Sequence, residues 1–298
     1  MDLTKTQFDI LSYIAESSSP LTQREIESKT GYSLGTVNNV IKEMTELGYV
    51  KNRRITDDGL IALEPYRAKR AVFIAAGFGS RLAPITFNTP KPLVRVYGVR
   101  IIDRMIDACL NVGINDIYIV RGYLADQFDQ LLYKYPMIKF LENPVYNESN
   151  SISSAMVARF LLSNSYVIES DLLIYNPAII KKYYYNSKYY GIKRQRTDDW
   201  VIKTKNGIIY DEVCGGEGEN IYQMVGISYW TENDGHKLSY DISEVYQSPG
   251  GKERFWEQVP IIYRKEHYTV EIQECTDSDV VEIDTLNELK AIDKTYDV

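Results

Sequence analysis

The chain has 298 residues, of which 44% are hydrophobic and 25% are charged, and its net charge is −7 at pH 7. This composition is typical of a globular protein of one or two domains, and the negative charge argues against general nucleic-acid binding by the whole chain. The three cysteines are widely scattered and the two histidines are too few for an obvious zinc site. No segment reaches the roughly 18 apolar residues of a membrane span and no signal peptide is apparent, so we expect a cytoplasmic protein without a membrane partner.

The N-terminal part of the chain has the pattern of a small helical domain. Apolar residues recur at helical spacing over residues 8–14, and Thr22 with Glu25 three residues later is the capping box of a second helix. Ser33 is placed to cap a third helix, and residues 49–55 are predicted to form a short hairpin. The sequence therefore predicts a helix, a helix-turn-helix, a wing and a final short helix.

This order resembles the winged helix-turn-helix domain of bacterial MarR-like proteins, notably in L-T-Q-R-E-I, S-L-G-T-V-N and L-G-Y-V. The resemblance implies a DNA partner, contacted by the polar side chains of the third helix, which are Ser33, Thr36, Asn38, Asn39 and Lys42. Residues 1–70, however, carry ten Lys/Arg and ten Asp/Glu, against the basic footprint of a DNA-binding domain. A dimerisation or regulatory module is therefore the alternative for this domain, which we delimit as residues 1–68.

The second domain, residues 69–298, alternates strands and helices as far as Glu169. Strands are expected at 71–76, 117–120, 138–141 and 166–169, and helices at 101–111, 126–133 and 150–162. Such alternation predicts an α/β fold with a mostly parallel, mixed, Rossmann-like sheet. The remainder from about Gly191 has mainly the pattern of strands and hairpins, and would form one wall of a pocket.

A glycine loop follows the first of these strands. Gly77 and Gly79 leave backbone N–H groups bare for a phosphate, and Arg81 adds a planar set of donors for phosphate oxygens. Lys91 lies between two prolines, which stiffen its loop. A dinucleotide-binding loop is excluded because Leu82 occupies the position of its third glycine.

The pattern G-x-G-x-R-L followed by P-K-P-L resembles the signature of nucleotidyltransferases with a glycosyltransferase-A-like fold. The resemblance implies that the glycine loop and Arg81 hold a triphosphate and that Lys91 neutralises charge developing on the α-phosphate. Asp171 follows one strand and Asp284 another, where ligands gather in open α/β sheets, although either is also an ordinary turn or cap residue. Both are candidate ligands of Mg²⁺, and Asp171 is also a candidate catalytic residue.

A narrower resemblance is to bacterial CTP:phosphocholine cytidylyltransferases of the cell-surface decoration type. It rests on A-A-G-F-G-S-R-L, N-T-P-K-P-L, S-Y-V-I-E-S-D, D-D-W, V-G-I-S-Y-W and V-E-I-D-T-L, spread along the second domain. One departure is Glu169, where the family often has aspartate. The nucleotide-binding residues implied by both resemblances are Ala75, Ala76, Gly77, Gly79, Ser80, Arg81, Lys91, Gly122, Tyr123, Asn150, Ser151 and Ser154.

All three tryptophans lie in the later half of the second domain, near acidic residues. Aromatic faces bind quaternary ammonium by cation–π attraction, whereas carboxylates such as Glu257 favour a primary ammonium. Packing in a core is the alternative for any tryptophan. The candidate acceptor-binding residues are Asp199, Trp200, Tyr229, Trp230 and Trp256.

The sequence thus predicts an enzyme that transfers CMP from CTP to a phosphorylated amino-alcohol with Mg²⁺, releasing pyrophosphate. Phosphocholine is the preferred acceptor, and 2-aminoethylphosphonate or phosphoethanolamine is the alternative. A sugar-1-phosphate nucleotidyltransferase is a rival, although a sugar site favours hydrogen-bonding side chains over tryptophans. A nucleotide-sensing transcriptional regulator is a rival from another class, but it has no need of Arg81, Lys91 and Asp171 together. The oligomeric state is left open, a homodimer included.

Overall fold

The computed structural model describes residues 2–297, which form two compact units. Unit 1 contains the chain as far as Arg67 together with Tyr183–Tyr185. Unit 2 contains Ala68–Lys182 and the chain from Asn186 on. Among residues 2–297, no helix has both the length and the apolar character needed to cross a membrane.

Unit 1 has the predicted winged helix-turn-helix order. Its elements are α1 (Lys5–Glu16), α2 (Gln23–Thr30), α3 (Leu34–Glu46), β1 (Val50–Lys51), β2 (Arg54–Ile55) and α4 (Asp57–Leu63). The predicted caps are present: the Thr22 side chain accepts from the backbone of Glu25, whose carboxylate accepts from the Thr22 backbone, and Ser33 caps α3. Local capping chemistry therefore sets the start of each of these helices.

The core of unit 1 includes a segment distant in the sequence. Tyr185 stacks on Tyr66 with ring centroids 5.5 Å apart, and its hydroxyl donates to the backbone oxygen of Leu3 at 3.1 Å. Phe8 packs against both tyrosine rings. The expected division of the chain at a single point between residues 68 and 69 leaves out this contribution of Tyr183–Tyr185.

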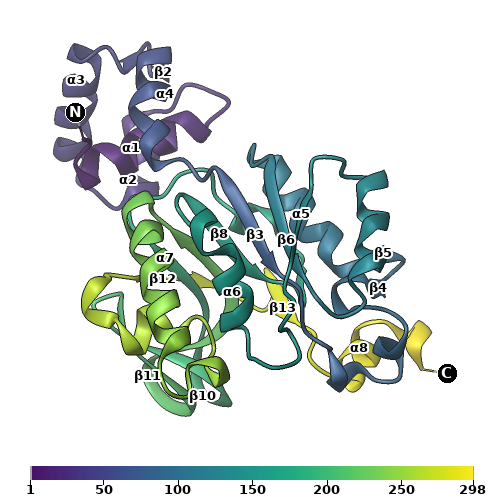
Figure 1. Ribbon diagram of the computed structural model, residues 1–298. Coiled ribbons are helices and arrows are strands. Elements are labelled where there is room, and N and C mark those ends of the chain that lie inside the picture. The colour runs from purple at the N-terminus through teal and green to yellow at the C-terminus, as the bar shows by residue number, and fades with distance from the viewer. Residues whose placement is uncertain (1, 298) are drawn as a thin grey trace. The chain divides into compact units, whose positions relative to one another are not determined.

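Unit 2 is built on a seven-stranded sheet with the order β10-β12-β11-β8-β3-β6-β7. The parallel strands are β3 (Arg70–Ile74), β6 (Asp116–Arg121), β7 (Lys139–Glu142) and β8 (Ser165–Glu169). Figure 1 shows β8, β3 and β6 side by side. The long strands β10 (Lys188–Lys205) and β11 (Ile208–Trp230) form an antiparallel hairpin, β11 runs antiparallel to β8, and β12 (Glu271–Cys275) is parallel to β10. The mostly parallel α/β fold predicted from the sequence is confirmed.

Two small antiparallel pairs complete the strands of unit 2. These are β4 (Arg95–Val96) with β5 (Val99–Arg100), and β9 (Leu172–Ile174) with β13 (Val280–Glu282). The second pair joins segments more than 100 residues apart in the sequence, and it has consequences for the site.

The helices of unit 2 differ from the prediction in several places. They are α5 (Ile101–Asn111), α6 (Ile152–Ala158), α7 (Glu232–Gln247) and α8 (Leu286–Ile292). The helix expected at 126–133 is a 3₁₀ segment over Ala125–Tyr133, and α6 is shorter than the expected 150–162 because it tightens into a 3₁₀ turn at Arg159. The helix α7 was not predicted, although Thr231 caps it and its buried Leu238, Ile242 and Val245 have helical spacing.

Candidate active site

The glycine loop that follows β3 is packed directly against the loop of Lys91. Gly79 has φ +61°, and a Cβ at this position would lie 2.9 Å from Lys91 Cβ and 3.2 Å from Thr86 Cγ2. The Thr86 hydroxyl donates to the Gly79 backbone oxygen at 2.9 Å. A residue with a side chain would be strained at this positive φ, and its Cβ would also displace Lys91. Glycine is therefore required at position 79 for both reasons.

Lys91 is a buried cation between two carboxylates. Its side-chain Nζ donates to Asp171 Oδ2 at 2.9 Å and to Asp284 Oδ1 at 3.1 Å, and the residue is only 8% exposed. Burial by itself would lower the pKa of Lys91, but Asp171 and then Asp284 outweigh it, so the pKa is raised. Arg81 donates through Nη2 to the same Asp284 oxygen at 2.6 Å, while its side chain remains 64% exposed. Lys91 therefore stays charged, and the exposed part of the Arg81 guanidinium can meet an anion from solvent.

The pairing of β9 with β13 brings the two aspartates together. Asp171 lies in the turn between β8 and β9, and the backbone N–H of Ile283 donates to the Asp171 backbone oxygen at 3.0 Å. Asp284 is the next residue after Ile283, so its carboxylate is directed to the same place. The two strand ends meet because of a tertiary pairing that no local sequence pattern encodes.

Three carboxylates at this position could hold a divalent cation. One oxygen each of Asp171, Glu282 and Asp284 lies within 4.8 Å of the others. Asp171 Oδ1 is buried and has no hydrogen-bond partner among residues 2–297. Partial removal from water, followed by the charges of Asp171 and Asp284, raises the pKa of Glu282 to about 9. An orphaned oxygen in a crowded anionic cluster fits a hard cation with oxygen ligands, such as Mg²⁺.

These groups open onto a cavity of about 620 Å³ in unit 2. The glycine loop, Lys91 and the acidic cluster form one part of its wall. Residues 198–200 of β10, with Phe255 and Glu257, form another part, in which the Trp200 and Phe255 rings are 5.5 Å apart at 65°. The cavity therefore has one side that is rich in charge and another side where aromatic rings and carboxylates mix.

A third part of the wall is neutral and polar. The buried Asn143 donates through Nδ2 to Ser153 Oγ at 2.9 Å and to Ser154 Oγ at 3.0 Å. Phe78 lies 5.3 Å from Tyr146, ring centroid to centroid. Amide, hydroxyl and aromatic groups together suit a nucleobase and its ribose.

Comparison with known proteins places this site in a family. The nucleotidyl transferase family matches residues 70–190, and the MarR family matches residues 1–61. The chain is 34% identical over 229 residues to the 2-aminoethylphosphonate cytidylyltransferase of Lancefieldella rimae, a similarity that covers 76% of this chain and 92% of that protein. The chain belongs to the nucleotidyltransferase family.

This nucleotidyltransferase is also similar, in sequence and in structure, to a cytidylyltransferase of Streptococcus pneumoniae. Its choline-phosphate cytidylyltransferase is 29% identical over 227 residues, which are 76% of this chain and 97% of that protein. The solved structure of the CTP:phosphocholine cytidylyltransferase LicC from the same organism matches with a TM-score of 0.70 and 28% identity, over 77% of this chain and 99% of that chain. The relatives are thus cytidylyltransferases with different named acceptors.

Most nucleotide-binding residues expected from the sequence line the cavity of this nucleotidyltransferase. Gly122 and Tyr123 do not. The Tyr146 ring lies against Gly122, where a Cβ would be 2.6 Å from Tyr146 Cγ, and Tyr123 donates from its backbone to Ala76 and from its hydroxyl to Thr86. These two residues support the wall instead of forming it. The expected residues that do line the cavity are Ala75, Ala76, Gly77, Gly79, Ser80, Arg81, Lys91, Asn150, Ser151 and Ser154.

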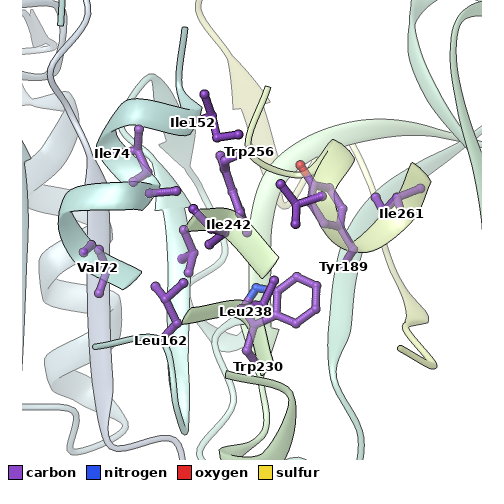
Figure 2. Close-up of a cluster of buried hydrophobic side chains, with 14 of the residues drawn as sticks. Val72, Ile74, Ile152, Leu162, Tyr189, Trp230, Leu238, Ile242, Trp256 and Ile261 are labelled. Carbon is purple, nitrogen blue, oxygen red and sulfur yellow. The ribbon is translucent and has the colours of Figure 1, made fainter. Parts of the chain in front are cut away.

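The expected cage of tryptophans is corrected by the structure. Trp200 and Asp199 both line the cavity. Trp200 is 39% exposed, and the Asp199 carboxylate accepts a hydrogen bond from the Gln223 side chain at 2.9 Å. Tyr229, Trp230 and Trp256 are at most 2% exposed and are absent from the wall. Figure 2 shows Trp230 and Trp256 within the buried cluster that also contains Leu238 and Ile242 of the unpredicted helix α7. Once α7 is present it needs a large apolar surface beneath it, and the tryptophans supply that surface.

Sequence reasoning did not single out Asn143 and Tyr146. Both lie in the segment after β7, a parallel strand whose carboxyl end is at the same edge of the sheet as the glycine loop. Ligands in open α/β sheets bind at that edge. The polar segment N-P-V-Y after a predicted strand was therefore a usable signal.

Proposed function

We propose that the protein transfers CMP from CTP to a small acceptor that carries a phosphoryl or phosphonyl group and an amine, with release of pyrophosphate. The observation that carries the proposal is the placement of Lys91 Nζ between Asp171 and Asp284, directly beside the glycine loop. Cytidine is proposed because relatives that match nearly the whole of unit 2 are cytidylyltransferases.

In this reaction an acceptor oxygen attacks the α-phosphorus of CTP. A new P–O bond forms, the bond from the α-phosphorus to the bridging β-oxygen breaks, and pyrophosphate takes the electron pair. The chain needs to align the reactants and neutralise charge, and no side chain has to bond covalently to the substrate. The N–H groups of the glycine loop and Arg81 hold the triphosphate, and Lys91 meets the charge that develops on the α-phosphate.

Asp171 and Asp284, with Glu282 beside them, would hold Mg²⁺. When bound, the ion would supply charge neutralisation at phosphate oxygens. Because Lys91 contacts both aspartates, its Nζ contributes to keeping this anionic cluster compact and able to accept the ion.

A pyrophosphate-release assay tests the proposal. Four NTPs are crossed with phosphoethanolamine, phosphocholine, 2-aminoethylphosphonate and sugar 1-phosphates at saturating Mg²⁺. We expect CTP with an amine-bearing acceptor to exceed every other pairing by at least about tenfold in kcat/KM, which is roughly 1.4 kcal/mol of transition-state discrimination. Turnover of a sugar 1-phosphate above all amine-bearing acceptors would replace the proposal with the sugar nucleotidyltransferase alternative.

A second candidate function, DNA binding by unit 1, is favoured by one specific observation. The exposed side chains of α3 include Asn38, Asn39 and Lys42, while the wing exposes all of residues 51–54, K-N-R-R. This geometry gives a recognition helix a polar face and a flanking basic tip, which suit bases and phosphates respectively.

The test is fluorescence anisotropy of the full-length chain with duplex DNA from the region upstream of its own gene. Because phosphate contacts release counterions, the affinity is expected to fall steeply, by at least about tenfold, between about 50 and 200 mM salt. Alanine at Lys51, Arg53 and Arg54 together should weaken binding and flatten the salt slope, whereas Lys134→Ala on unit 2 should not. Absence of a complex at low salt would leave unit 1 as a regulatory or dimerisation module.

A further inference from the structure

Two glutamates beside the cavity take no part in the nucleotide chemistry proposed above. Glu257 lines the cavity, and its neighbour Gln258 donates through Nε2 to Glu212 Oε1 at 3.4 Å. Glu212 lies on β11 and is only 6% exposed. One glutamate thus faces the cavity and the other stands behind it.

Each of these carboxylates keeps a buried oxygen without a hydrogen bond. Within the part of the chain that the structure describes, neither Glu212 Oε2 nor Glu257 Oε2 has a partner. No Lys, Arg or His nitrogen of residues 2–297 lies within 4.0 Å of either carboxylate; the ion pairs of unit 2 are elsewhere. Burying a carboxylate without donors is costly, and a ligand that brings N–H donors and a positive charge would relieve that cost.

Electrostatics links the two carboxyl groups. Burial and then the charge of Glu257 raise the pKa of Glu212 to about 8, and burial raises the pKa of Glu257 to about 7. The buried Tyr189, which also lines the cavity, has its pKa raised by burial and then by Glu257, Glu169 and Glu212. The charged groups that act on Glu212 and on Tyr189 are all acidic.

We propose that Glu257, with Glu212 behind it, binds a primary ammonium group of the acceptor. The inference rests on the proposed function and names its acceptor class: an aminoalkyl phosphate or phosphonate with a free amine. A primary ammonium offers three N–H donors and a full charge, which suits unpartnered carboxylate oxygens. A trimethylammonium group has no N–H to donate to Glu257, which lines the cavity.

The aromatic residues of the cavity wall are compatible with a primary ammonium in the acceptor. Of the aromatic residues expected to cage a quaternary ammonium, only Trp200 lines the cavity, where it meets Phe255 edge to face. Two rings in this arrangement can cover the methylene chain of an acceptor and leave its end to Glu257. Glu257 is therefore assigned as the binding residue, and Glu212, which is coupled to Glu257 electrostatically and accepts from its neighbour Gln258, as a positioning residue.

The experiment uses acceptors that differ only in their number of N–H donors. Phosphoethanolamine and its N-methyl, N,N-dimethyl and N,N,N-trimethyl derivatives keep one phosphate and one chain, and 2-aminoethylphosphonate adds a phosphonate arm with a free amine. We expect kcat/KM with CTP to fall at least tenfold from the first to the last of the methyl series. The loss should lie in KM for the acceptor, with KM for CTP unchanged.

Variants assign the effect to the glutamates. Glu257→Gln should raise KM for phosphoethanolamine at least tenfold and flatten the methyl series, while Glu212→Gln, which keeps an oxygen for Gln258, should raise it about threefold or more. Glu244→Gln is the matched control because it removes the same charge from an exposed site that pairs with Arg264. A Glu212→Gln protein with unchanged KM for every acceptor would remove Glu212 from the assignment.

The outcomes separate this inference from the proposed function. If phosphocholine exceeds phosphoethanolamine tenfold or more in the wild-type enzyme, the primary-ammonium assignment is overturned and the cytidylyltransferase proposal stands. If no amine-bearing acceptor releases pyrophosphate from CTP, both fail together. The wild-type series decides the acceptor class even where a glutamate variant does not fold.

Discussion

Lys91→Ala is expected to lower kcat for CTP-dependent pyrophosphate release at least about a hundredfold, the scale for the loss of one preorganised electrostatic stabiliser. The lysine is 8% exposed, stays charged, and contacts both aspartates of the acidic cluster. No other lysine lines the cavity among the described residues, so none is placed to take over its role. Steady-state kinetics at saturating CTP and acceptor measures the effect.

The variant has a structural consequence that must be separated from catalysis. Loss of the cation leaves Asp171 and Asp284 facing each other with only Arg81 as a partner for the latter. Lys91→Met keeps most of the buried volume and should show the same loss of kcat with a smaller change in Tm. Lys134→Ala, which removes an exposed lysine paired with Asp107, is the control and should retain wild-type turnover. Near-normal turnover of Lys91→Met would remove the lysine from the mechanism.

Asp171→Asn is expected to reduce activity by about a thousandfold, at the upper end of the range for one electrostatic group. The amide keeps the shape of the side chain but removes the charge that a divalent cation and Lys91 both require. Titration of Mg²⁺ should not restore turnover at millimolar concentrations.

A readout that does not depend on turnover accompanies this test. The wild-type protein should gain thermal stability when Mg²⁺ is added together with CTP, because a ligand that binds only the folded state raises Tm. In Asp171→Asn, most of the Mg²⁺-dependent rise in Tm should be lost. Asp116→Asn, a carboxylate that pairs with Arg70 and Lys139 on unit 2, should behave as wild type. A Mg²⁺ titration of Asp171→Asn that overlays the wild type would refute the metal assignment.

The sequence by itself determined the features that depend on near neighbours. The capping residues Thr22 and Ser33 of unit 1 predict where its helices begin, because each cap satisfies backbone groups within three residues. The glycine loop and the proline-flanked Lys91 are equally local, since the backbone of Gly79 and the stiffness around Lys91 are properties of short segments. The family, the glycine loop and the candidate role of Lys91 follow from these patterns.

The tertiary structure alone decided which side chains face the cavity. Tryptophan spacing could not separate Trp200, on the wall, from Trp230 and Trp256, in the core, because the difference depends on where α7 packs. The meeting of Asp171 with Asp284 depends on the pairing of β9 with β13. Glu212 of β11 accepts from Gln258, the neighbour of Glu257, and one buried oxygen of each glutamate has no partner among the described residues. Burial and pairing of this kind depend on many contacts between residues that are distant in the sequence, so no local sequence pattern predicts them.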